Sequence, residues 1–563
     1  TVIVAISPTY FGYKLVISMK ALMENVAFIP EALADGVALH QPAKSKKAIT
    51  ILSPPVVQLL QKLHTRFQPE RKRLLEVRKE RQLRYDAGVL PGYLADVNPE
   101  ALLDWQVPVI PTDLQKRRVE ITGPVNSAKM VVQMLNRNEA GYRADTAMLD
   151  FEDSMKPSWE NVVDGVLNVV AVAENRLQAV ENGKQYLLHS DDRAVMMVRV
   201  RGLALEESNL RINGEAISGG LFDLVLTWMH TAQKLVAQGK TPKYYIPKTE
   251  YHEEARWWNA VFCALEDEIG VPEGTLRATF LIETLPATFE MEEILYEFRT
   301  HAAGMNVGRW DKIFSDIKVL KNHPDRIMGD RATITIKSDT PWMYQYARRL
   351  IQVCHKHGAF AIGGMAAFTP GKTPELRAAQ TAKVVADKQL EASLGHDGCW
   401  VSHPYFIGPA LEQFTRDNQL EVLQNDLENQ PDLLPQGRGP YTIEGLRTNV
   451  RVGIGYQEGW NRNVGCVAWD NLMEDLATLE ISRAQVWQWL RHGIVLEDGR
   501  VVTKALVSLV FEEELLKIEQ ELVEANASIQ VLSAFKKAAS DAEALFLQED
   551  FRPHLALASD LVR

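Results

Sequence analysis

The chain has 563 residues, of which 46% are hydrophobic and 24% are charged, an ordinary composition for a globular protein. Its 62 Lys and Arg residues are outnumbered by 73 Asp and Glu residues, and the net charge of −11 argues against a protein that coats nucleic acid. The length exceeds that of one ordinary hydrophobic core, so we expect two or more domains, or one large barrel.

The four cysteines are Cys263, Cys354, Cys399 and Cys466. None lies in a C-x-x-C pair, and four in a chain of this length do not indicate a disulfide framework, so we expect a reducing intracellular compartment. The apolar stretch Thr1–Tyr13 is too short to span a bilayer and lacks the pattern of a secretory signal, so we expect no membrane partner. The final Leu561-Val562-Arg563 differs from the peroxisomal S-K-L ending, and the sequence leaves open a peroxisomal (glyoxysomal) or a cytoplasmic location.

Residues 1–114 are predicted to form a helical N-terminal segment. Within it, the stretch Pro55–Arg84 carries apolar residues at helical spacing, followed by turns that are rich in Arg, Glu and Lys. Such a charge pattern is typical of a solvated helix rather than of a binding surface.

From residue 119 onward, eight short apolar runs alternate with segments that read as amphipathic helices, such as Glu253–Glu268 and Pro341–His357. This alternation predicts parallel strands with helical crossovers, and eight repeats fit a (β/α)₈ TIM barrel over residues 115–410. The runs are Val119–Gly123, Ala147–Asp153, Met196–Gly202, Tyr244–Thr249, Thr279–Thr284, Gly304–Trp310, Phe360–Ala366 and Cys399–Pro404. Strand signals fade after residue 410, so residues 411–563 are predicted to form a helical C-terminal domain.

Charged side chains gather at the ends of the predicted strands, where barrels of this type place their catalytic groups. Each taken alone could be a solvated loop residue or a salt-bridge partner. Several at successive strand ends instead suit a hard cation such as Mg²⁺, which prefers oxygen ligands and usually takes one or two carboxylates. These residues are Glu152, Asp153, Arg199, Arg201, Lys248, Glu283, Asp311 and His403.

A set of motifs in a fixed order indicates the family to which this pattern belongs. GMNVGRWD at 304–311 is accompanied by RRVEITGP (117–124), DFEDS (150–154), IPKTE (246–250), LIETLPA (281–287), GGMAAF (363–368), HDGCW (396–400) and MEDLATLEISR (473–483). The set closely resembles the signature of the malate synthase family, in particular its shorter A-type members, from about residue 50 to at least 510. Residues 1–35 have no counterpart in this resemblance.

The resemblance implies an acyltransferase of the glyoxylate cycle that condenses acetyl-CoA with glyoxylate and hydrolyses malyl-CoA to malate and CoA. It implies Mg²⁺ as the cofactor, with Glu283 and Asp311 as its ligands and with Glu152 and Asp153 holding the metal's waters. The other implied roles are Arg199 as the catalytic arginine that faces the substrate oxygens, Asp475 as the catalytic base, and Gly308, Trp310 and Asp311 in glyoxylate binding.

These residue types suit the chemistry. The methyl protons of acetyl-CoA are weakly acidic, so the reaction needs a positioned base and a stabilised enolate. Without the family, Asp475 reads as a charge at the start of the helix that follows it, a common use of an acid. Arg199 and Arg201 point to opposite faces of a strand, so only one of them can enter the site directly.

Some positions depart from the family pattern. Lys312 stands where tyrosine is usual, and Val307 replaces a common cysteine. Neither change removes a proposed metal ligand, the catalytic arginine or the base. Both therefore bear on the details of the substrate pocket more than on the reaction itself.

Two other functions compete with this interpretation. An acyl-CoA lyase with a similar barrel would share the Mg²⁺ carboxylates but would not finish by hydrolysis, and the long C-terminal domain with Asp475 argues against it. A catalytically silent relative would serve as a structural or assembly protein, and the argument against that is the retention together of Glu283, Asp311, Arg199 and Asp475. Whether the chain forms a homo-oligomer is left open.

Overall fold

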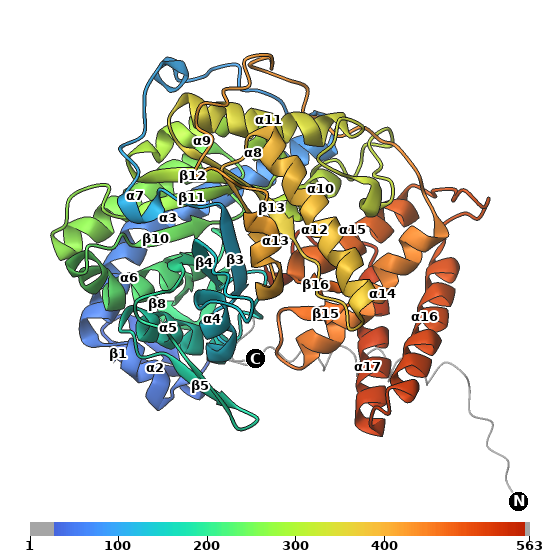
Figure 1. Ribbon diagram of the computed structural model, residues 1–563, viewed down its shortest axis with the longest axis horizontal. Coiled ribbons are helices and arrows are strands. Elements are labelled where there is room, and N and C mark those ends of the chain that lie inside the picture. The colour runs from blue at the N-terminus through green and yellow to red at the C-terminus, as the bar shows by residue number, and fades with distance from the viewer. Residues whose placement is uncertain (1–27, 558–563) are drawn as a thin grey trace, which may run out of the picture.

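The computed structural model describes residues 28–557 (Figure 1). The terminal stretches Thr1–Tyr13 and Leu561–Arg563, on which expectations were stated above, lie outside these residues. Within residues 28–557, no helix combines the length and the apolar character that crossing a membrane requires.

Eight parallel strands close into a barrel, and they follow one another around it in chain order. Each strand overlaps one of the eight predicted runs, so the predicted (β/α)₈ barrel is confirmed. The strands are β3 (Val119–Pro124), β4 (Thr146–Asp150), β7 (Val195–Arg199), β10 (Lys243–Ile246), β11 (Arg277–Ile282), β12 (Ala302–Val307), β13 (Phe360–Ala366) and β14 (Gly398–Val401).

Helices surround the barrel, so its strands are covered on their outer face and packed against each other on the inner face. Every residue of β11 and of β12 is buried, which explains why these strands read as continuous apolar runs rather than as alternating ones. The helices between the strands and after β14 are α4 (Ala128–Leu135), α5 (Trp159–Ala173), α6 (Gly219–Ala237), α7 (His252–Ile269), α8 (Leu285–Thr288), α9 (Met291–Glu297), α10 (Arg309–Val319), α11 (Pro341–Lys356), α12 (Pro374–Leu394) and α13 (Ile407–Leu411). A hairpin of β5 (Gln178–Glu181) and β6 (Lys184–Leu187) follows α5 and extends outward from the barrel (Figure 1).

The N-terminal part contains the long helix predicted from its apolar spacing, α3 (Pro54–Asp86), and a short helix, α2 (Lys46–Ile51). This helical segment also contains two short strands, which the sequence analysis did not predict. The strands β1 (Pro30–Ala34) and β2 (Val37–His40) join β8 (Glu206–Ile212) and β9 (Glu215–Ser218) in a four-stranded antiparallel sheet. The strands that complete this sheet come from an insertion after β7, so local periodicity in the N-terminal segment could not reveal it.

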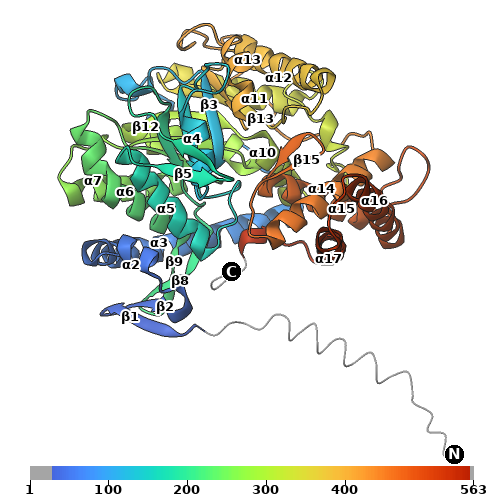
Figure 2. The ribbon, with the colours of Figure 1, turned by 60° about the horizontal axis from the view of Figure 1, so that its bottom comes forward.

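The C-terminal part is mainly helical, with α14 (Ile443–Asn461), α15 (Leu476–Arg491), α16 (Lys504–Glu524), α17 (Ile529–Phe546) and a small hairpin of β15 (Val467–Trp469) and β16 (Leu472–Glu474). These helices share an apolar cluster of their own, which includes Val450, Trp489 and Phe511. The C-terminal helices stand on one side of the barrel (Figure 2), and α15 packs against α10. The N–H of Leu476, at the start of α15, donates to the carbonyl oxygen of Asp153 just after β4, so this start lies at the carboxyl ends of the strands.

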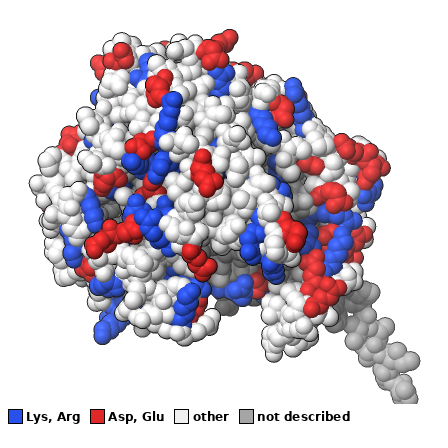
Figure 3. All heavy atoms as spheres, viewed as in Figure 1, with Lys and Arg blue, Asp and Glu red and all other residues white. Residues whose placement is uncertain are grey.

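The surface viewed in Figure 3 carries acidic and basic side chains in alternation. No part of this face is covered by one sign of charge over a wide area, although the chain as a whole has a net charge of −11. This face therefore lacks the basic stripe that is typical of nucleic-acid binding.

Candidate active site

A cavity lies at the carboxyl ends of the barrel strands and encloses about 790 Å³, including the part that is open to solvent. We call it the site cavity. Its lining includes Arg199, Glu283, Trp310, Asp311 and Asp475. Side chains from three barrel segments and from the C-terminal part therefore face one space, as parallel strand ends in a closed barrel require.

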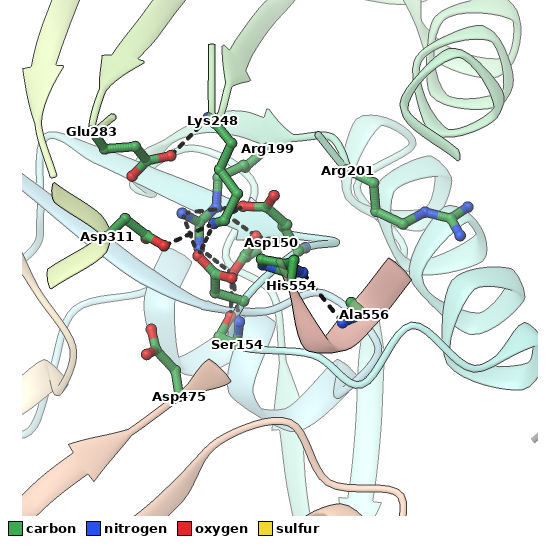
Figure 4. Close-up of polar contacts among 12 residues, drawn as sticks. Asp150, Ser154, Arg199, Arg201, Lys248, Glu283, Asp311, Asp475, His554 and Ala556 are labelled. Carbon is green, nitrogen blue, oxygen red and sulfur yellow. Dashed lines mark hydrogen bonds and ion pairs between the residues drawn. The ribbon is translucent and has the colours of Figure 1, made fainter. Parts of the chain in front are cut away.

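Lys248 lies at the centre of a cluster of carboxylates (Figure 4). Its Nζ is 2.6 Å from Asp153, 3.0 Å from Glu152 and 3.3 Å from Asp311. Its backbone N–H donates to Glu283 Oε1 at 2.8 Å, and its φ of 56° is uncommon for a residue other than glycine. The sequence pattern named Lys248 without giving it a role, and the structure makes it the group that all four carboxylates share.

Arg199 ends β7 and points into the same cluster (Figure 4). Its guanidinium makes two hydrogen bonds to Asp150, at 2.7 and 2.6 Å, and Nη1 lies 3.6 Å from Asp153 and 3.8 Å from Glu152. Asp150 also accepts hydrogen bonds from the backbone N–H groups of Glu152 and Ser154. One carboxylate thus fixes both the arginine and the loop that carries the two acids.

The cluster holds more negative than positive charge. Burial, together with the charge of Asp153, raises the pKa of Glu152 and the pKa of Asp311 well above their ordinary values, and burial also raises the pKa of Glu283. Burial opposes ionisation of Asp153 as well, but Lys248 and Arg199 hold its pKa below the ordinary value. Burial and the neighbouring carboxylates thus outweigh Lys248 and Arg199 at the three acids whose pKa is raised, and additional positive charge would lower their pKa values.

Two buried oxygens of the cluster, Glu152 Oε1 and Asp153 Oδ1, have no hydrogen-bond partner among the described residues. Unpaired buried acceptors are costly, so a donor or a cation that reaches them would stabilise the site. Within residues 28–557, no group of three or more His, Cys, Asp or Glu side chains is arranged to hold a metal by itself. The two unpaired oxygens are therefore the feature of the cluster that a donor or a cation would satisfy.

The N-terminus of α10 opens into the site cavity, with Gly308, Arg309, Trp310 and Asp311 in the lining. Lys312 is the first residue whose N–H bonds back to Gly308 O, so the N–H groups of the preceding turn remain available. The indole N–H of Trp310 is buried and also has no partner among the described residues. Such a helix start favours a small anion such as a carboxylate.

Asp475 is the N-cap residue of α15, and it also lines the site cavity. Its Oδ1 accepts a hydrogen bond from the N–H of Thr478 at 3.3 Å, and the Thr478 hydroxyl reaches back to the N–H of Asp475. Burial and the charge of Asp153 raise the pKa of Asp475 to about 7. Asp475 therefore does cap α15, as its position in the sequence alone suggested. Its side chain nevertheless still faces the cavity (Figure 4).

Comparison with known proteins gives matches over most of the chain. Residues 195–434 match the family model described as malate synthase, TIM barrel domain, residues 440–557 match malate synthase, C-terminal, and residues 37–96 match malate synthase, N-terminal domain. Malate synthase A of Escherichia coli is 46% identical over 486 residues, which cover 85% of this chain and 90% of the relative.

The chain belongs to the malate synthase family. Two further malate synthases show how widely the similarity extends. The protein of Myxococcus xanthus is 45% identical over 84% of this chain and 87% of its own length, and the glyoxysomal enzyme of Candida tropicalis is 41% identical over 82% and 85%. The family predicted from the ordered motifs is thus confirmed.

Two residues named from the sequence lie away from the site cavity. Arg201 turns outward and pairs with Asp223 at 2.8 Å and with Glu207 at 3.0 Å. His403 caps a short 3₁₀ helix by accepting the N–H of Tyr405 and does not line the cavity.

Sequence patterns did not single out Asp150 or His554. Asp150 is the register partner of Arg199 across β4 and β7, so an opposite charge at matching strand ends was an available signal. His554 lines a second cavity of about 590 Å³ on the other side of the cluster, with Glu152, Lys248, Glu283 and Asp311 also in its lining. No local pattern predicts that a residue so near the end of the chain reaches the barrel mouth.

Proposed function

We propose that this member of the malate synthase family condenses acetyl-CoA with glyoxylate at the site cavity and hydrolyses malyl-CoA to malate and CoA. The observation that carries the assignment of residues is the meeting of Asp475, from the C-terminal part, with Arg199, Glu283 and Asp311 in one cavity. A base, a fixed cation and oxygen ligands are the three groups that the condensation needs.

Mg²⁺ is the cofactor in this proposal, with Glu283 and Asp311 as ligands and with Glu152 and Asp153 holding its waters. The unpartnered oxygens of Glu152 and Asp153 and the raised pKa values of Glu283 and Asp311 support the fit, because added positive charge relieves both. When bound, Mg²⁺ supplies Lewis acidity toward the glyoxylate aldehyde.

The protein's own groups orient and activate the two substrates. The N–H groups of Trp310 and Asp311, at the start of α10, bind the glyoxylate carboxylate. Gly308 lines the same corner of the cavity, but its N–H is already used by the Tyr346 hydroxyl at 3.1 Å, so its contribution is close approach of the backbone rather than a free donor.

Asp475 takes a proton from the acetyl methyl group, and Arg199 stabilises the enolate oxygen that results. The pKa of about 7 makes Asp475 a much stronger base than an exposed aspartate, which suits removal of a weakly acidic proton. Arg199 stays charged at any working pH, and its two hydrogen bonds to Asp150 keep the guanidinium in a fixed orientation.

We also propose a division of the chain into an N-terminal segment over residues 1–114, the barrel over 115–410 and a C-terminal domain over 411–563 that carries the base. The packing of α15 on α10 supports this arrangement, because it delivers Asp475 to the barrel mouth.

A thiol-release assay tests the proposed reaction. Free CoA should appear from acetyl-CoA only when glyoxylate and Mg²⁺ are both present, and omission of any one of the three should abolish it. Release of CoA that does not depend on glyoxylate would indicate a simple thioesterase. Cleavage of malyl-CoA to acetyl-CoA and glyoxylate without release of CoA would indicate the lyase.

A further inference from the structure

The hydroxyl of Tyr346 lies between the ends of the two strands that lead to the proposed metal ligands. Tyr346 belongs to α11 and is fully buried. Its hydroxyl accepts a hydrogen bond from the N–H of Gly308 at 3.1 Å and donates one to the carbonyl oxygen of Ile282. Ile282 ends β11 directly before Glu283, and Gly308 follows β12, three residues before Asp311. One hydroxyl thus ties both ligand-bearing segments together.

The two ligand-bearing segments are packed so closely that no additional atom fits between them. A Cβ atom placed on Gly308 would lie 2.5 Å from Glu283 Oε2 and 2.6 Å from its Cβ, so the Glu283 side chain rests directly on the Gly308 backbone. Any change in the separation of the two strand ends therefore moves Glu283 relative to the first turn of α10. Mg²⁺ tolerates little change, because it requires near-octahedral oxygen ligands at about 2.0–2.1 Å.

A buried ion pair on α10 lies beside the ring of Tyr346. The ammonium of Lys312 lies 5.6 Å from the ring centroid, and Lys312 also pairs with Asp316. The side chains of both residues of the pair have no exposure to solvent. Lys312 directly follows Asp311, so the cation that contacts the ring is one residue away from a proposed ligand. This gives a structural role to a lysine that departs from the family pattern.

We propose that Tyr346 is a positioning residue that sets the spacing between Glu283 and Asp311, and that the Lys312–Asp316 pair holds its ring in place. The proposal rests on the assignment of these two carboxylates as Mg²⁺ ligands. Tyr346 lines neither the site cavity nor the second cavity, so it acts through the strand ends and not by touching the substrate.

The Tyr346→Phe variant removes the hydroxyl and leaves the ring. Dissociation constants for Mg²⁺ by calorimetry, and for Mn²⁺ by electron paramagnetic resonance, should rise about 10- to 100-fold, the usual effect of losing a group that orients a metal ligand. Turnover should fall at limiting Mg²⁺ and recover as Mg²⁺ is raised. A loss of general structural integrity would not be reversed in this way.

Tyr93→Phe is the matched control. Its hydroxyl also donates to a backbone carbonyl, that of Pro431, at 2.9 Å, but Pro431 belongs to neither of the segments that carry Glu283 and Asp311. This variant should keep wild-type metal affinity. The double variant K312M/D316N removes both buried charges together and should weaken Mg²⁺ binding less than Tyr346→Phe does. Unchanged Mg²⁺ binding in the double variant would show that the ion pair does not help to position Tyr346.

Two outcomes separate the inference from the proposed function. If the wild-type protein binds Mg²⁺ in a manner abolished by Glu283→Gln, and folded Tyr346→Phe binds it equally well, the positioning role is wrong while the ligand assignment stands. If Glu283→Gln leaves wild-type Mg²⁺ binding unchanged, the ligand assignment fails and the positioning role falls with it. Circular dichroism and thermal unfolding establish that each variant is folded at the temperature of measurement.

Discussion

Asp150 and Arg199 are register partners at the ends of β4 and β7, and two hydrogen bonds of 2.7 and 2.6 Å join their side chains. The pair is buried, with side-chain exposures of 0% and 4%. A bidentate contact fixes the plane of the guanidinium as well as its position. The direction in which Arg199 presents its remaining N–H groups to the site cavity is therefore set before any substrate binds.

Replacing Arg199 by lysine should keep the charge but lose this orientation, because an ammonium cannot reproduce the planar two-point contact. We expect kcat to fall about 10²–10³-fold, the usual cost of removing a group that stabilises a developing oxyanion. Arg201→Lys is the matched control, since Arg201 is also buried and also bidentate, toward Asp223, but faces away from the site. Steady-state kinetics that show equal losses in the two variants would contradict a specific role for Arg199.

Replacing Glu283 by glutamine should weaken Mg²⁺ binding at least about 10-fold and lower turnover in parallel, because a neutral amide is a poorer ligand for a hard cation. Calorimetric titration with Mg²⁺ measures the first effect and thiol release measures the second. Glu266→Gln provides a control, since Glu266 is a buried acid on α7 whose carboxylate accepts backbone N–H groups of Gly274 and Leu276. Normal Mg²⁺ dependence in Glu283→Gln would rule out the proposed ligand.

The order of the elements could be predicted from the sequence because it depends on local periodicity. All eight barrel strands overlap predicted runs, and the helix predicted over Pro55–Arg84 is α3, Pro54–Asp86. The strands β1 and β2 could not be predicted in the same way, because their partners β8 and β9 lie more than 150 residues away in the chain. Non-local pairing leaves little trace in the residues of one strand alone.

The residues of the candidate site also divide into those that the sequence could predict and those that it could not. Strand-end acids such as Glu283 and Asp311 stand out, since charges after buried strands are conspicuous. Asp475 became a candidate only through the family resemblance, because its approach to the barrel depends on the packing of α15 against α10. Tyr346 gave no signal at all, because a tyrosine in an amphipathic helix looks like an ordinary core residue.

Alanine at Gly308 should displace Glu283, because the added methyl group would lie within 2.6 Å of two Glu283 atoms. We expect weaker Mg²⁺ binding and a higher KM for glyoxylate, with only a modest change in thermal stability. Gly92→Ala is the control, since a Cβ there has no neighbour within 4 Å. If Gly308→Ala retains wild-type Mg²⁺ affinity, the close contact between the two segments does not control the ligand.

The pH dependence of kcat/KM should report the ionisation of Asp475. Its pKa is raised to about 7, so below that pH the carboxyl is protonated and cannot accept a proton from the acetyl group. Bound Mg²⁺ adds positive charge to the same cavity, so the acid limb of the loaded enzyme should lie below pH 7, with about a tenfold loss per pH unit beneath it. An acid limb well above pH 7 would assign the titration to another group.

The most direct measurement is the turnover of Asp475→Asn together with its Mg²⁺ affinity. Asparagine is as good an N-cap as aspartate, so α15 should keep its start and the fold should be preserved. We expect kcat to fall about 10²–10⁴-fold, the contribution typical of a general base, while Mg²⁺ and glyoxylate binding remain close to wild type. A folded Asp475→Asn protein with near-normal turnover would show that Asp475 serves only as the cap of α15 and that the base lies elsewhere.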